Sequence, residues 1–99
     1  MNLEKTFEHY AQKTKGGEYI FELWAGMYCN LAGFINSLSE EHTALPAQIA
    51  VMRTLRTTAE QDETKNGFIY YIKDKDRFIS YLESLLSVLD SPKHLKIKN

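Results

Sequence analysis

The longest uninterrupted apolar pattern of the chain lies between residues 18 and 38 (EYIFELWAGMYCNLAGFINSL). No charged residue occurs from Leu23 to Ser39, and the apolar positions cover most of a helical circumference. One apolar seam runs from Ile20 to Leu38 at intervals of three and four residues. We therefore predict a single helix over 18–38 that is packed on more than one side.

Three further segments carry helical spacing. Residues 2–13 predict a short first helix with Asn2 as its N-cap, and Gly16-Gly17 follows as a terminator. Residues 45–64 and 68–89 predict two longer helices whose lengths match that of 18–38. Helices of similar length joined by short loops are typical of antiparallel bundles. The predicted fold class is therefore all-α, an antiparallel bundle of three to four helices.

The segment that begins at residue 67 has an alternative interpretation. Its sequence, GFIYYIK, has high β propensity, and the residues HLKIK near the C-terminus alternate apolar and basic positions. A short β ribbon between 67–73 and 94–98 is the alternative to a continuous helix. In that case Asp74 or Asp76 would cap a shorter final helix.

The size and composition are those of one globular domain. The 99 residues are 43% hydrophobic and 25% charged, and we find no internal repeat. We assign 1–92 to the helical bundle and 93–99 to a basic C-terminal tail. The single cysteine, Cys29, and the absence of a recognisable leader favour a cytoplasmic protein, and the uncharged stretch is short for a membrane span.

Charge is distributed unevenly along the chain. The formal net charge is −1, but residues 1–64 carry five Lys/Arg against nine Asp/Glu, and residues 65–99 carry seven against four. The overall balance disfavours a general nucleic-acid binder. The alternative function is a nucleic-acid-binding regulator that uses the basic C-terminal third, with Lys73, Lys75, Arg77, Lys93, Lys96 and Lys98 as its contacts.

Signatures of catalysis are missing from the sequence. The three histidines, His9, His42 and His94, lie in three different segments, and no HExxH, P-loop, GxGxxG or GxSxG motif occurs. We expect Cys29 to be a buried, unreactive thiol. The sequence predicts no catalytic residues, no metal site, no cofactor and no enzyme.

The excess of apolar and aromatic positions in 18–38 indicates either a central helix with neighbours on both sides or a helix of which one side meets another chain. Aromatic anchors are enriched at interface cores, and small residues at heptad spacing let a second backbone approach. The predicted partner-binding residues are Trp24, Tyr28, Gly26, Gly33, Arg53 and Arg56. We expect a small protein of the inhibitor, immunity, adaptor or chaperone type that acts by stoichiometric binding, and a homodimer formed through helix 18–38 is a secondary expectation.

Overall fold

The computed structural model describes residues 2–27 and 29–89, and it is a mixed α/β fold. In chain order the elements are α1 (Leu3–Tyr10), β1 (Gln12–Lys13), β2 (Tyr19–Trp24), α2 (Asn30–Leu38), α3 (Ala44–Thr58), β3 (Glu60–Glu63), β4 (Gly67–Ile72) and α4 (Lys75–Leu89). The order helix–strand–strand–helix therefore occurs twice.

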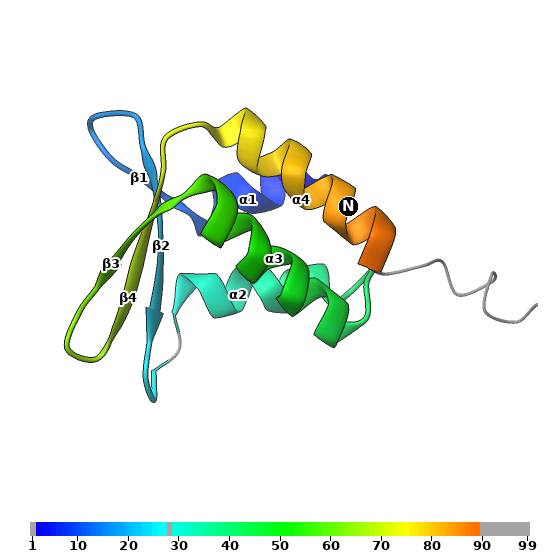
Figure 1. Cartoon of the computed structure of the whole chain (residues 1–99), viewed down its shortest axis with the longest axis horizontal. Helices are drawn as coiled ribbons and strands as arrows, with labels where there is room; N and C mark the ends of the chain where they lie inside the picture. Colours follow the sequence, from blue (N-terminus) through cyan, green and yellow to red (C-terminus); the bar gives the residue numbers. More distant parts are fainter. Residues whose placement is uncertain (1, 28, 90–99) are drawn as a thin grey trace, which may run out of the picture.

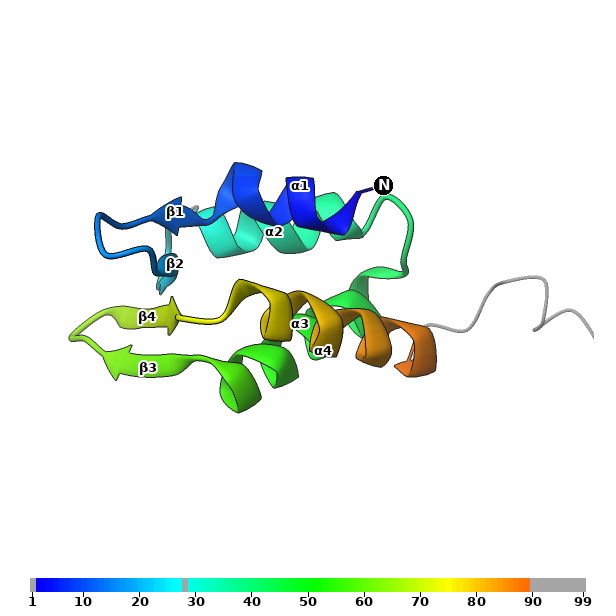
Figure 2. The same cartoon turned by 90° about the horizontal axis from the view of Figure 1, so that it is seen from above.

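One antiparallel sheet joins the two halves. Its strand order is β1-β2-β4-β3, so that the central pair, β2 and β4, comes from different halves. In the part of the chain that the structure describes, all four helices lie on one side of this sheet and none lies over the opposite side (Figure 1). Seen from above, α1 and α2 form one pair and α3 and α4 form the other (Figure 2).

The all-α bundle predicted from the sequence is wrong, and so is the single helix over 18–38. That segment contains β2, then a turn in which Gly26 has a φ of +70°, and then α2. An apolar run that is buried on both sides has no clear period, so spacing alone does not separate a helix from a buried strand. The β-branched and aromatic residues of Tyr19–Trp24 favour the strand once β4 supplies a partner.

The two later helices were also predicted too long. The helix predicted over 45–64 ends at Thr58, and the one predicted over 68–89 begins only at Lys75, because 67–72 is β4. The alternative strand at 67–73 was correct in kind, but β4 pairs with β2 and β3. Its proposed partner, 94–98, lies outside the described residues. The predicted boundary between the 1–92 domain and the 93–99 tail lies outside them as well.

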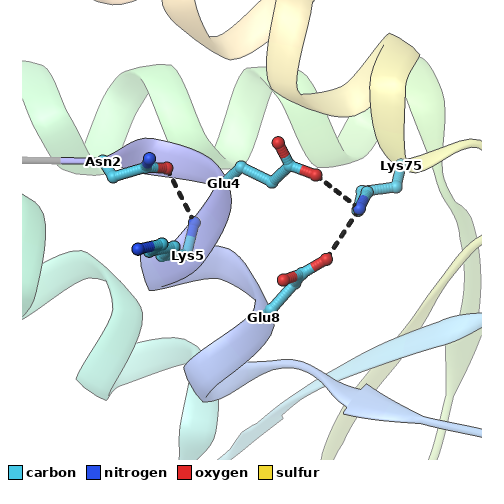
Figure 3. A network of polar contacts seen from close by, with 5 residues as sticks. All are labelled: Asn2, Glu4, Lys5, Glu8 and Lys75. Atoms are coloured by element: carbon cyan, nitrogen blue, oxygen red, sulfur yellow. Dashed lines mark hydrogen bonds and ion pairs between the residues drawn. The ribbon is translucent and has the colours of Figure 1, made fainter.

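The predicted N-cap at Asn2 is confirmed, and of the two caps offered with the alternative strand at 67–73 it is Asp74 that caps α4. The Lys5 backbone amide donates to the Asn2 side-chain oxygen at 3.0 Å (Figure 3), and the Arg77 amide donates to the Asp74 carboxylate at 3.0 Å. Each bond satisfies one of the free N–H groups in a first helical turn. These local signals are independent of which elements the helices later pack against.

Four phenylalanines form the centre of the core. Phe7 of α1, Phe21 of β2, Phe34 of α2 and Phe78 of α4 are all fully buried, and every pair of their rings has centroids 5.0–6.4 Å apart. Offset and edge-to-face contacts at such distances add to the free energy gained by burial. The cluster packs the inner side of the sheet against helices of both halves.

Candidate protein-binding surface

The uncovered side of the sheet is identified by the strand register. Phe21, Tyr70 and Ile72 are buried toward the helices, so the alternate residues of β2 and β4 point to the opposite side. The cross-strand pairs on that side are Ile20 with Tyr71, Glu22 with Ile69 and Trp24 with Gly67, and β3 adds Glu60 beside Tyr71 and Asp62 beside Ile69. We call this set the outer face.

The middle of the outer face is apolar. Its four large apolar side chains, Ile20, Trp24, Ile69 and Tyr71, are all half-buried although no helix covers them. Solvent-facing sides of antiparallel sheets are usually polar. A row of aromatic and branched side chains here is the kind of surface that marks an interaction site.

Trp24 is held rigidly in this surface. Its indole nitrogen donates to the Glu22 carboxylate at 2.7 Å. It packs over Gly67, where an added Cβ would lie 2.9 Å from the indole ring and would run into the Leu23 carbonyl oxygen. Gly67 thus allows β4 to approach β2 closely, and the indole covers the bare backbone that results.

Acidic side chains surround the apolar middle. Burial raises the pKa of the Tyr71 hydroxyl, and the Asp62 carboxylate raises that pKa further, with smaller contributions from Glu18 and Glu22. Each of these carboxylates is therefore close enough to Tyr71 to act on it. Lys73 pairs with Glu60 at 3.0 Å, and its pKa is raised by Glu60 and, to a smaller extent, by Glu18. The other carboxylates that act on Tyr71 from around the outer face are Glu22 and Asp62.

A hollow continues the outer face at the end of the sheet. It has a volume of about 440 Å³ and lies between the ends of β2 and β4 and the turn that joins β3 to β4. Trp24 and Phe68 form part of its wall, and Lys65 and Asn66 contribute the turn. The hollow is large enough to receive a side chain from a partner next to Trp24.

The partner-binding residues predicted from the sequence do not come together. Trp24 lies on the outer face, whereas Gly26 is in the turn after β2 and Gly33 is buried within α2. Arg53 and Arg56 are exposed on α3, on the helical side of the sheet. Tyr28 lies outside the described residues. The small-residue stripe proposed for a homodimer does not exist, because Gly26 and Gly33 share no helix.

The basic residues of the alternative function are partly paired with acids. Lys73 pairs with Glu60, and Lys75 of α4 bridges Glu4 and Glu8 of α1 at 2.7 Å each (Figure 3). Arg77 is exposed in the first turn of α4, while Lys93, Lys96 and Lys98 lie outside the described residues. The described members of this set do not form a free basic patch.

Sequence reasoning missed most of the outer face. Ile20, Ile69, Tyr71, Glu60 and Asp62 were all assigned to helices. The available signal was the alternation of apolar and polar positions in IFELW, together with the β propensity of FIYYI. The expectation that Cys29 is buried is confirmed, since it is 8% exposed.

Residues 2–27 and 29–89 contain no group of three or more His, Cys, Asp or Glu side chains arranged to hold a metal ion. None of the helices described there has the length and apolar character needed to cross a membrane.

Comparison with known proteins gives no relative. No protein-family model matches the chain, and neither the curated proteins nor the solved structures include a significant match.

Proposed function

We propose that this chain acts by stoichiometric binding of another protein through the outer face of its sheet. The observation that carries the proposal is the uncovered apolar row of Ile20, Trp24, Ile69 and Tyr71 with carboxylates around it. An apolar centre with a polar rim is the general anatomy of protein interfaces. Small inhibitor, immunity and adaptor proteins act by binding of this kind.

The preorganisation of Trp24 supports the proposal. Its hydrogen bond to Glu22 and its packing over Gly67 fix the indole before any partner arrives. Ordering a side chain on binding costs free energy, so an anchor that is already ordered contributes more to affinity. Tryptophan is also among the residues that most often dominate binding energy.

The charge of the outer face indicates the chemistry of the partner. The carboxylates of Glu22 and Asp62 in the rim favour a partner surface that has Lys or Arg around an apolar centre. Two copies meeting through this face would bring like charges together. We therefore propose a basic partner of a different sequence and not a homodimer through the outer face.

The test is capture of a partner from lysate of the native host with matched variants. We expect Ile69→Arg to reduce capture of the specific partner at least about tenfold, since it places a bulky cation at the apolar centre. Val88→Arg is the control, because Val88 is 74% exposed on α4, away from the sheet. Circular dichroism verifies that both variants fold. Equal capture by the two variants would contradict binding through the outer face.

A further inference from the structure

The two edges of the sheet differ in the hydrogen bonds that their backbone groups make. At the β2 edge, β1 pairs only with Tyr19 and Ile20. Next to β1, the Asn30 side chain bonds to the β2 backbone. Its Nδ2 donates to the Ile20 carbonyl at 3.0 Å, and its Oδ1 accepts from the Glu22 amide at 2.8 Å. A side-chain amide thus takes the place of a strand beside Ile20 and Glu22.

Within residues 2–27 and 29–89, no strand pairs with the outer edge of β3, and we call this edge open. β3 is the outermost strand on its side, and all four of its residues are exposed. The Thr64 amide donates to the Gly67 carbonyl at 2.8 Å, which makes Thr64 and Gly67 a hydrogen-bonded pair. Hydrogen-bonded and non-hydrogen-bonded pairs alternate along an antiparallel ladder. Asp62 and Glu60 therefore bond to β4, and the N–H and C=O groups of Gln61 and Glu63 point to the open edge.

The side chains of β3 decide what this edge can accept. The strand has the sequence EQDE, with three carboxylates and no cation. Two copies of β3 side by side would juxtapose six carboxylates, and like charges on neighbouring strands are destabilising. Charged residues on an edge strand also prevent aggregation. An incoming strand with Lys or Arg would instead be stabilised by the same carboxylates.

We infer that the open edge of β3 receives an extended basic segment of the partner protein as a fifth strand. The inference deepens the proposed function and rests on it. The segment exchanges backbone hydrogen bonds with Gln61 and Glu63. The residue opposite Asp62 then forms a non-hydrogen-bonded pair with it, where side chains lie closest. A Lys or Arg there lies on the outer face, beside Asp62 and Glu60, so strand addition and outer-face contact occur together.

The test uses the full chain labelled with 15N and a synthetic peptide, acetyl-Thr-Lys-Ile-Lys-Val-Lys-Thr-amide. We expect the amide signals of Gln61 and Glu63 to shift on titration and their hydrogen exchange to slow, because those N–H groups enter a ladder. A peptide of the same sequence and charge, N-methylated at alternate residues, cannot pair and should leave both amides unprotected.

Matched charge reversals add a second readout. Asp62→Lys, which reverses the charge on the outer face beside the lysines of the peptide, should weaken peptide binding at least about tenfold, whereas Glu83→Lys, exposed on α4, should leave it unchanged. Three results would each overturn strand addition. They are equal binding of the N-methylated peptide, equal effects of the two charge reversals, and no perturbation of the amide signals up to millimolar peptide. Perturbation confined to Ile69, Tyr71 and Trp24 also overturns it while leaving the outer-face proposal intact, and loss of capture by Ile69→Arg tests that proposal separately.

Discussion

The half-buried side chain of Asn30 makes hydrogen bonds to three backbone groups. Besides its two bonds to the β2 backbone, its Nδ2 donates to the Tyr10 carbonyl at 3.0 Å, so it joins the end of α1, the edge of β2 and the start of α2. Backbone groups that lose such a partner away from water carry a free-energy penalty. From the sequence, Asn30 was one of several small residues on a helix.

We expect Asn30→Ala to lower the free energy of unfolding by about 2–4 kcal/mol, because three backbone groups lose their partner. Asn30→Asp, which keeps the shape but replaces the donor by an anion facing two carbonyls, should cost at least as much. Urea unfolding measures both. Asn36→Ala, at an exposed position of α2, is the control and should change the free energy by less than about 0.5 kcal/mol. A similar loss in Asn36→Ala would refute the role given to Asn30.

Gly67 is the second residue whose role depends on one neighbour. We expect Gly67→Ala to destabilise the fold by about 1–3 kcal/mol, because its Cβ would collide with the Leu23 carbonyl and displace the indole of Trp24. Trp24 fluorescence should change in the same variant. Gly16→Ala is the matched control, since its Cβ would meet only the Thr14 hydroxyl at an ordinary 3.8 Å. If both glycine variants unfold at the same urea concentration, the close approach of β4 to β2 is not required.

At the scale of elements, α1 and α4 are joined by one lysine. Lys75, whose side chain is 22% exposed, contacts Glu4 and Glu8 on successive turns of α1 (Figure 3). Hydrogen bonds to these two carboxylates raise the pKa of the Lys75 ammonium well above its usual range. A raised pKa in the folded state means that protonation stabilises the fold.

The pH dependence of stability tests this bridge. The contribution is fully present below the pKa of an unfolded lysine, about 10.4, and is lost as the pH rises through the higher folded-state value. We expect the wild type to lose more stability between pH 9 and pH 11.5 than Lys75→Met does, as measured by urea unfolding. Lys65→Met, in the exposed β3–β4 turn, should keep the wild-type pH dependence. If the free energy of unfolding falls equally with pH in wild type and Lys75→Met, the bridge contributes nothing to stability.

At the scale of the whole molecule, the two helix–strand–strand–helix halves are interlocked. The central strands β2 and β4 belong to different halves, and the four-phenylalanine cluster takes Phe78 from the second half and its other members from the first. No repeat is visible in the sequence because the hairpins differ in length and the buried positions are filled by different residues. The shared topology leaves every helix on one side of the sheet and the outer face uncovered.

Part of the candidate site was visible in the sequence. Trp24 was chosen because an aromatic residue in an excess of apolar surface often belongs to an interface, and it does lie on the outer face. Its supposed companions were placed by helical spacing, which does not apply to a strand. The carboxylates of β3 were regarded as a solvated helix end, because a polar segment such as EQDET has no hydrophobic period from which a strand would be predicted.

The sequence by itself determined the local features of this protein. These are the N-cap of α1 at Asn2, the burial of Cys29 and the high apolar content of 18–38, and each depends only on neighbouring residues or residue type. The tertiary structure alone decided that 18–38 divides into a strand and a helix. It also decided which side of each strand is covered, because strand pairing joins residues almost fifty positions apart and a shift of one residue would exchange the two sides. The acidic-rimmed outer face and the open edge of β3 exist only as consequences of that register.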